Sequence, residues 1–429
     1  MTDASWVIGD LLKRPIPSHS EAFKAAGTEF LNKALRTTGS LPIDNYITNI
    51  TRIEPCLGGS TGHKLRLDVN YANNQAGLHQ KLFVKFSRDF NDKMRDQLKD
   101  QLEAEVKMGL LSKEPDFPIE VPKCYFADYH QSSGTGILIT ERIAFGLNGI
   151  EPIHEKCLDH LLPNALEYYR AIIKTLATLA GTQQSKSFNK TVERYFPRHN
   201  ASPSLQQPIR YDEHKMQDRI NKYCDFANRY PQLIPGNLRT PEFFAQLKKD
   251  IPLLLKYEKK IKTFLHTDNS LIALMHWNAN IDNAWFSRNK DGELSCGLMD
   301  WGSTSQMNIG LALWGSLNAA ETNIWNNHLD ELIDLFVTTA QQSGGVVFFH
   351  NTLRLHIQIC AIMMGLAWLM DAPALIKHQV SDLHKVPNRF DPRICDDEMT
   401  RTQLQMLSNF LNQLQRLDLS KLINQLANQ

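Results

Sequence analysis

The sequence lacks the features that mark disulfide-stabilised, zinc-binding and membrane-spanning proteins. Its seven cysteines are scattered, odd in number and without a CxxC pair, which disfavours a disulfide framework or structural zinc site and favours a reducing compartment. The first residues contain no uninterrupted apolar core of the signal-peptide kind. The longest apolar run, Ile359 to Met370, is too short to span a bilayer and predicts a buried helix. We therefore expect a cytoplasmic protein without a membrane span.

The sequence also lacks an excess of acidic or of basic residues. The 429 residues include 47 Lys and Arg against 46 Asp and Glu, so no global field selects nucleic acid or an anionic membrane as a partner. Neither a repeat nor a low-complexity tract is present. The hydrophobic fraction of 42% is ordinary for a globular protein, and the length suggests two or three domains.

Strand patterns dominate the first third of the chain after a lead-in over residues 1–45, which is predicted to be helical near 20–35. From Leu65 to Tyr71 apolar and polar residues alternate with a period of two, and a turn-forming stretch follows. Residues 46–145 are predicted to contain one helix and four such strands: the helix over 91–111 and the strands near 65–71, 82–86, 122–129 and 136–143.

Helical patterns dominate the remainder, with predicted helices over 161–180 and 253–265 and a surface loop over 198–210. A strand–loop–strand island over 273–301 interrupts them, and an amphipathic tail follows with a break near Asp418. We predict an α+β fold of two lobes, a small antiparallel sheet with one helix and a large, mainly helical lobe. The predicted division is 1–45, 46–145, 146–400 and 401–429.

The stretch CLGGSTGHKLRL contains Gly58, Gly59, Ser60 and Gly62. It differs from a Walker A loop because its glycines are misplaced, Leu65 follows Lys64, and a strand rather than a helix comes next. A glycine-rich turn between two strands is how protein kinases cover ATP phosphates. A flexible hairpin explains the stretch equally well when it is taken alone.

Lys85 stands among large apolar residues in a predicted strand, where its charge needs a partner. Strand parity places it on the face opposite Val84, and an edge lysine reaching water is the alternative. In the next predicted helix, Glu105 lies on the apolar stripe, whereas Glu103 is turned about 100° away. Glu105 is therefore the expected partner of Lys85, unless it forms a surface pair at the boundary of the stripe.

A third candidate is MHWNANIDNAWF, in which His276 and Asn283 flank Asn278. The spacing matches H-x-D-x-x-x-x-N except at the aspartate, and Asp300 follows seventeen residues after Asn283. Amide and carboxylate oxygens suit Mg²⁺. By itself, Asp300 before Trp-Gly is also explained as a turn-capping residue.

The order of these motifs resembles the kinase-like phosphotransferase superfamily, in its aminoglycoside phosphotransferase and choline-kinase-like branch, over residues 50–320. In that branch the loop commonly is HGDxxxxN, and Trp often follows the second metal-binding Asp, as in Met299-Asp300-Trp301. The resemblance implies a protein-kinase-like fold and use of ATP, or another nucleoside triphosphate, with Mg²⁺.

The resemblance also implies roles for individual residues. Gly58 to Gly62 would cover the phosphates, Lys85 would hold the α- and β-phosphates with Glu105 orienting it, and Glu141 to Ile143 would form the adenine hinge. Asn283 and Asp300 would ligate Mg²⁺. The acceptor would be a hydroxyl of a small molecule bound by the helical lobe.

Two departures from the family pattern matter. Asn278 replaces the catalytic Asp, and Gly310-Leu311-Ala312 lacks the Asp that often precedes Leu-Ala. An amide cannot accept a proton as a carboxylate does, although phosphoryl transfer relies mainly on positioning and charge neutralisation. Asp282, next to Asn283, is a candidate substitute base.

Three functions therefore compete: a phosphotransferase with an atypical base, a pseudokinase that binds nucleotide without turnover, and transfer of another group such as AMP. The identity of the acceptor and the oligomeric state are not encoded in any recognisable pattern. No acidic cluster dense enough for a polycationic aminoglycoside stands out. The aromatic residues of the helical lobe, including Tyr168, Trp314 and Trp368, are predicted to pack in the core.

Overall fold

The computed structural model describes residues 5–56, 62–90, 92–183, 186–198, 208–345 and 347–427. The chain divides into two compact units. The first, called the sheet unit here, comprises Met1–Pro152, Ser185–Pro197 and Gly297–Ser305. The second, called the helical unit, comprises Ile153–Gln184, Arg198–Cys296 and Gln306–Gln429.

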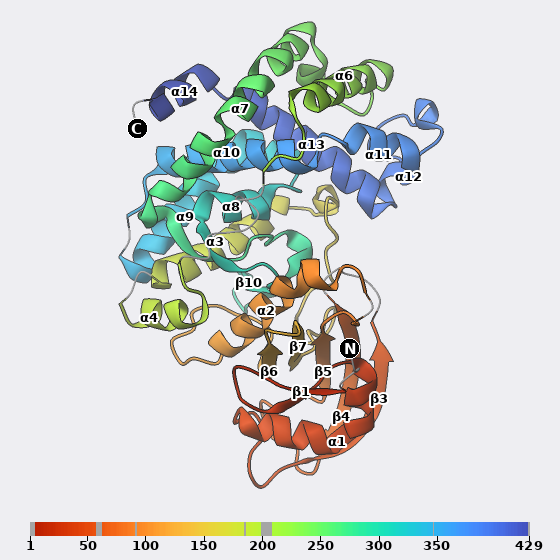
Figure 1. The fold of residues 1–429 in the computed structure, drawn as a ribbon, viewed down its shortest axis with the longest axis vertical. Helices are drawn as coiled ribbons and strands as arrows, with labels where there is room; N and C mark the ends of the chain where they lie inside the picture. The colour runs from red at the N-terminus through yellow and green to blue at the C-terminus, as the bar shows by residue number, and fades with distance from the viewer. Residues whose placement is uncertain are drawn as a thin grey trace. The chain divides into compact units, whose positions relative to one another are not determined.

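The sheet unit is built on five antiparallel strands in the order β3-β4-β5-β7-β6 (Figure 1). Their bounds are β3 (Ile47–Pro55), β4 (His63–Tyr71), β5 (Lys81–Phe86), β6 (Cys124–His130) and β7 (Thr135–Glu141). The alternation predicted for β4 is confirmed, because Leu65, Leu67 and Val69 are buried while Arg66 and Asn70 are exposed.

One helix covers each face of this sheet. Helix α1 (Ser20–Thr37) packs Phe23 and Leu31 into the core formed by Leu65, Leu67 and Val84. Helix α2 (Arg95–Leu111) packs on the other face; its apolar side chains Leu102, Val106 and Leu110 meet Cys124 and Leu138. Lys85 is paired with Leu138 across β5 and β7, so the lysine belongs to the face that α2 covers.

The lead-in over residues 1–45 holds the predicted helix and also a hairpin that was not predicted, β1 (Trp6–Ile8) paired with β2 (Pro15–Pro17). Strands of three residues are too short for a periodicity to emerge. The backbone of α1 bends at Gly27, whose φ is 53°. Because Phe23 and Leu31 enter the sheet core, the lead-in is part of the sheet unit.

Two segments distant in sequence complete the sheet unit. Helix α4 (Lys186–Tyr195) packs against α2, with the Phe188 ring edge-on to Phe117 at a centroid distance of 6.3 Å. The 297–305 turn is tied in by a backbone hydrogen bond of 3.0 Å from Leu298 N to Glu120 O. Asp300 therefore lies in the same unit as Lys85.

The helical unit contains, besides long helices, all of β8 and β9 and most of β10 and β11; β9 pairs with β10, and β8 pairs with β11. The strands are β8 (Ile272–Met275), β9 (Ala284–Arg288), β10 (Leu294–Leu298) and β11 (Ser305–Asn308). The longer helices are α3 (Ala165–Gln183), α6 (Glu213–Arg229), α7 (Pro241–Thr267), α8 (Ile309–Leu317), α9 (Leu329–Gly344), α10 (His350–Trp368), α11 (Ala372–Gln379), α13 (Glu398–Arg416) and α14 (Leu419–Ala427). The short α12 (Pro392–Cys395) precedes α13.

The predicted α+β class, with a small antiparallel sheet unit and a mainly helical second unit, is confirmed. The break near Asp418 is found between α13 and α14. The apolar run at 359–370 falls mostly in α10 and is largely buried, as predicted. Most of the 198–210 loop lies outside the described residues.

Across the described ranges, no helix taken singly has the length and apolar character needed to cross a membrane. The bent pair of α10 and α11, with an angle of 53° between them, meets the length and composition criteria together.

Candidate active site

The predicted Lys85 and Glu105 form an ion pair on the α2 face of the sheet. Lys85 Nζ lies 2.5 Å from Glu105 Oε2 and 2.5 Å from Asp300 Oδ1. Glu103 instead pairs with Lys107 one turn along α2, at 2.6 Å. The helical phase of α2 thus selects Glu105 as the partner, as predicted from its position on the apolar stripe.

Burial makes this lysine dependent on its carboxylates. Lys85 is 8% exposed and Glu105 is 3% exposed. Burial alone lowers the pKa of Lys85, but the charges of Glu105 and Asp300 outweigh it and raise the pKa above its usual value. Lys85 therefore remains a cation at every physiological pH. Such a fixed, desolvated cation suits a phosphate oxygen.

Asp300 presents its carboxylate from a turn in a left-handed conformation, with φ of 62°. Asp tolerates this conformation better than most residues because its short side chain bonds locally. The adjoining Trp301 is buried and donates its indole N–H to Leu298 O at 3.0 Å, which fixes the turn. The Asp300 side chain remains 40% exposed.

A second lysine was missed as a site residue. Lys64 pairs directly with Lys85 across β4 and β5, so both side chains leave the same face of the sheet. Burial and the charge of Lys85 lower the pKa of Lys64. A linear pattern could not single it out, because its pairing with Lys85 depends on the register of β4 and β5.

Gly62 and the predicted hinge lie at opposite ends of β5, because Gly62 approaches Phe86 and Glu141 pairs with Leu82. Gly58, Gly59 and Ser60 fall outside the described residues. A Cβ at Gly62 would lie 1.9 Å from Phe86 O, so only glycine fits this close approach to β5. The adenine hinge over 141–143 stays a prediction.

At that hinge, Glu141 is held by two contacts within the sheet unit. Its Oε1 accepts a hydrogen bond of 2.8 Å from Lys123 N, and its Oε2 lies 3.0 Å from His79 Nε2. Ile143 follows in half-buried, irregular backbone. The carboxylate of Glu141 is therefore engaged in holding β6 and β7 together at this end.

In the helical unit, backbone and side-chain hydrogen bonds shape the 276–283 loop. His276 is fully buried, and its Nδ1 accepts a hydrogen bond of 3.1 Å from Asn278 N. Asn283 donates its side-chain N–H to Asn278 O at 2.8 Å. Asn280, which the sequence did not single out, donates its side-chain N–H to Asn278 Oδ1. Three predicted loop residues are thus brought together.

Helix α8 reaches the backbone of this loop at Gly315. A Cβ at this position would lie 1.8 Å from Trp277 O. Because no side chain fits in that space, Gly315 allows α8 to support the residue just before Asn278.

Asp282, the candidate substitute base, forms an ion pair with Lys156. Its Oδ2 lies 3.5 Å from Lys156 Nζ, and its Oδ1 is buried without a hydrogen-bond partner among the described residues. Burial raises the pKa of Asp282, and Lys156 opposes that rise. In the described part of the helical unit, Asp282 forms no hydrogen bond with Asn278, and its role as a base stays a prediction.

The predicted cation ligands have the oxygen chemistry that Mg²⁺ requires. Asn283 uses its amide N–H on Asn278 O, which leaves its carbonyl oxygen as the group available to a ligand. Asp300 supplies a partly exposed carboxylate. Both are hard oxygen donors of the type that binds Mg²⁺ together with phosphates. Each of the two residues, taken by itself, thus has donor chemistry that suits the ion.

Aromatic side chains surround the start of this loop. Trp277 stands edge-on to Trp368 at a centroid distance of 5.3 Å and lies 6.5 Å from Trp314. Trp314 is buried, as predicted, whereas Trp368 is 39% exposed. The prediction that all these aromatics pack in the core is thus wrong for Trp368, which ends α10 and shows part of its ring to solvent.

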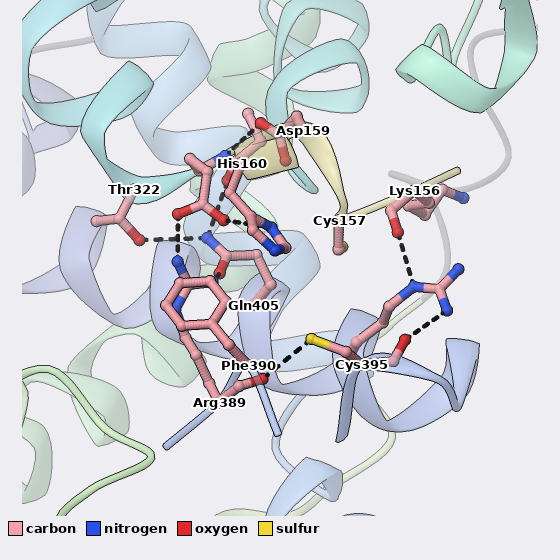
Figure 2. Close-up of polar contacts among 12 residues, drawn as sticks. Lys156, Cys157, Asp159, His160, Thr322, Arg389, Phe390, Cys395 and Gln405 are labelled. Atoms are coloured by element: carbon pink, nitrogen blue, oxygen red, sulfur yellow. Dashed lines mark hydrogen bonds and ion pairs between the residues drawn. The ribbon is translucent and has the colours of Figure 1, made fainter. Parts of the chain in front are cut away.

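A buried polar cluster elsewhere in the helical unit was not predicted (Figure 2). Asp159 Oδ2 accepts hydrogen bonds from Tyr169 Oη at 3.0 Å and from Glu321 N at 2.9 Å, while its Oδ1 has no hydrogen-bond partner in the described part of the chain. Arg389 donates to both Glu321 and Gln405. Burial raises the pKa of Asp159 to about 6. The sequence did not predict this cluster, because its polar residues are far apart along the chain and form no local pattern.

No protein-family model matches the chain, and no curated protein matches it. Among solved structures, it is similar to an ethanolamine kinase from Plasmodium vivax, at 14% identity over 94% of this chain and 90% of that one, with a TM-score of 0.43.

A choline kinase from Cryptosporidium parvum Iowa II is similar at 12% identity over 88% and 90% of the two chains, with a TM-score of 0.40. An aminoglycoside phosphotransferase from Streptomyces rimosus, in complex with ADP and streptomycin, is similar at 12% identity over 74% and 92%, with a TM-score of 0.32. The motifs in the sequence resemble the same kinds of protein, the choline kinases and the aminoglycoside phosphotransferases. At such identities and TM-scores, the function of this chain has to be inferred from its own residues.

Proposed function

We propose that the protein is a phosphotransferase that uses ATP, or another nucleoside triphosphate, with Mg²⁺ to phosphorylate a small molecule. The observation that supports this most directly is the buried Lys85 between Glu105 and Asp300. A buried lysine held by two carboxylates is costly as a purely structural device, because apolar residues of similar volume would stabilise the fold equally well.

Each part of the chain has a role in the proposed reaction. Lys85 would bind phosphate oxygens, with Glu105 holding its ammonium group in position. Asn283 and Asp300 would hold Mg²⁺, which neutralises phosphate charge when bound. Gly58 to Gly62 and Glu141 to Ile143 keep their predicted roles at the phosphates and the adenine.

Asn278 limits the rate for a hydroxyl acceptor, which must lose a proton when it is phosphorylated. Loss of a general base typically costs about 10²–10⁴-fold in rate. Positioning and charge neutralisation supply most of the acceleration in phosphoryl transfer, so slow turnover is expected rather than none. Asp282→Asn would lower turnover further if Asp282 takes the proton.

Thermal unfolding with and without Mg-ATP tests nucleotide binding. The unmodified protein should show a rise in Tm with Mg-ATP that Lys85→Met abolishes. Lys107→Met is the matched control, because Lys107 pairs with Glu103 on α2, and it should keep the shift. The absence of any shift in the unmodified protein with Mg-ATP and with the Mg complexes of the other nucleoside triphosphates would refute the proposal.

Product analysis with labelled ATP separates the three candidate functions. Transfer of label from the γ-phosphate to a small molecule supports the phosphotransferase. Transfer from the α-phosphate would identify AMP transfer instead. Binding without transfer of either label would identify a pseudokinase.

A further inference from the structure

The hydrogen bond between Asn280 and Asn278 determines which part of the Asn278 amide is available. Asn280 is 2% exposed, so packing holds its side chain in place while it donates to Asn278 Oδ1. Within the described helical unit, no residue accepts a hydrogen bond from Asn278 Nδ2. Asn278 is half-buried. Its Oδ1 thus already accepts one hydrogen bond, whereas its N–H groups are unused donors among the described residues.

An N–H donor complements an acceptor oxygen that is already ionised. A hydroxyl has to give up a proton during phosphorylation, and an amide cannot take it. A carboxylate is ionised at neutral pH and accepts hydrogen bonds through lone pairs on both oxygens. The amide at position 278 thus matches a carboxylate without any need for a base.

We infer that this loop phosphorylates carboxylates in addition to hydroxyls, and prefers them, forming acyl phosphates. The inference rests on the proposed phosphotransferase function. A lone pair of the carboxylate oxygen attacks the γ-phosphorus of a nucleoside triphosphate, and a new O–P bond forms. The bond from the γ-phosphorus to the β,γ-bridging oxygen breaks, and its electron pair leaves with the nucleoside diphosphate. No proton is taken up or released.

The charges of the loop are consistent with an anionic acceptor. Asp282 is paired with Lys156, and an amide replaces a carboxylate at position 278. A carboxylate at that position would repel an anionic acceptor at contact distance, where like charges cost most. Asn278 removes this repulsion.

The aromatic residues beside Asn278 indicate which kind of chemical group the carboxylate of the acceptor is attached to. Trp277 precedes Asn278 directly and packs edge-on with the partly exposed Trp368. Indole rings favour flat apolar or aromatic groups. Phenylacetate and benzoate are therefore suitable probes, with acetate as the probe that lacks an aromatic body.

The test compares each acid with its matched alcohol: phenylacetate with 2-phenylethanol, benzoate with benzyl alcohol and acetate with ethanol. The full chain is incubated with Mg-ATP, and ADP release is measured. Neutral hydroxylamine is added to trap acyl phosphates as hydroxamates. Hydroxamate should form with the acids, at a rate at least ten times that of ADP release with the matched alcohols. Equal or faster reaction of the alcohols would overturn the inference.

Two variants test the role of the Asn278 amide. Asn278→Asp should lower the acid-to-alcohol rate ratio at least ten-fold, because it restores a base and repels an anion. Asn280→Asp has no N–H to donate, so the Asn278 amide should turn its N–H toward residue 280 and its oxygen outward, and the ratio should fall again. Asn280 acts here as a positioning residue, and a purely structural role would leave the ratio unchanged.

Asn327→Ala is the matched control, because Asn327 donates to Asn323 in an exposed pair of the same unit. It should keep the ratio of the unmodified protein. Asn280→Ala serves as a second variant if Asn280→Asp does not fold, and the same fall in ratio is expected. An unchanged ratio in the folded variants would overturn the inference.

Failure of this inference is distinguishable from failure of the proposed function. Mg-ATP binding without hydroxamate from any of the three acids would refute carboxylate phosphorylation and leave the proposed function standing. Absence of binding of Mg-ATP and of the Mg complexes of the other nucleoside triphosphates would refute the proposed function itself, and with it the inference.

Discussion

Lys85 Nζ lies 2.5 Å from Asp300 Oδ1, although 215 positions separate the two residues in sequence. This contact places a predicted cation ligand directly on a predicted phosphate-binding lysine. A metal-bound nucleotide would compete for both groups, since the lysine would turn to phosphate and the carboxylate to the metal. Binding is therefore expected to be an exchange of ion pairs rather than the filling of an inert pocket.

Removal of Lys85 should affect stability and binding separately. Lys85→Met leaves Glu105 buried without its cation, which typically costs about 3–5 kcal/mol. The double variant Lys85→Met with Glu105→Leu replaces the pair by apolar groups and should recover most of that loss, yet remain unable to bind Mg-ATP. Urea unfolding and nucleotide titration measure the two effects. Recovery of Mg-ATP binding in the double variant would contradict the role assigned to Lys85.

Lys64 should contribute to nucleotide affinity without stabilising the fold. Its charge is partly desolvated and faces Lys85 across the strand pair, so Lys64→Met removes a repulsion and should not lower the free energy of unfolding. The same variant should weaken Mg-ATP binding about ten-fold, the loss of one charge-assisted hydrogen bond. Isothermal titration calorimetry with Mg-ATP measures the affinity. Lys33→Met, at an exposed ion pair on α1, is the control and should bind as the unmodified protein does. Unchanged affinity in Lys64→Met would show that this lysine does not contact nucleotide.

Asp159 should make the protein less stable as the pH rises from about 4 to about 6. Burial raises the pKa of this carboxyl from 3.8 to about 6. Between these values the folded state holds a proton that the unfolded state has released, so stability falls as the pH rises, and the full loss is reached above the folded-state pKa. A shift of roughly two pKa units corresponds to about 3 kcal/mol.

Asp159→Asn should therefore remove this pH dependence, because an amide does not titrate and still accepts hydrogen bonds from Tyr169 and Glu321. Urea unfolding at several pH values between 4 and 7 measures the difference between variant and unmodified protein. Asp291→Asn, at an exposed position, is the control. A difference that stays constant across this range would rule out Asp159 as the group responsible.

Gly315→Ala should disturb the loop that precedes Asn278. The added methyl group would overlap Trp277 O, so either α8 or the loop must move, at a cost of about 1–3 kcal/mol. Turnover should fall more than Mg-ATP affinity does. Gly236→Ala is the matched control, because the nearest atom to its Cβ is the end of the Arg239 side chain at 4.0 Å. Equal behaviour of the two variants would argue against support of the loop by α8.

Local periodicity predicted most of the fold. The alternation in β4 and the apolar stripe of α2 determine which side chains are buried, and from these the Lys85–Glu105 pair followed. The hairpin of β1 and β2 was missed because its strands are three residues long. Lys64 and the Asp159 cluster were missed because each depends on strand register or on helix packing, which a linear pattern does not contain.

The candidate site was predicted less completely. Order along the chain predicted Lys85, Asn283 and Asp300 as site residues, and the structure joins Lys85 to Asp300. The hydrogen bond from Asn280 to Asn278 was not predicted, because nothing in a loop sequence indicates which amide donates to which.

Asn283 is anchored to the main-chain oxygen of residue 278, not to its side chain. Every amino acid supplies that oxygen, so a replacement at position 278 leaves the anchor of Asn283 in place. The codons of asparagine and aspartate differ by a single base. One mutation at this codon would thus add or remove a proton acceptor and leave the proposed cation ligand in place.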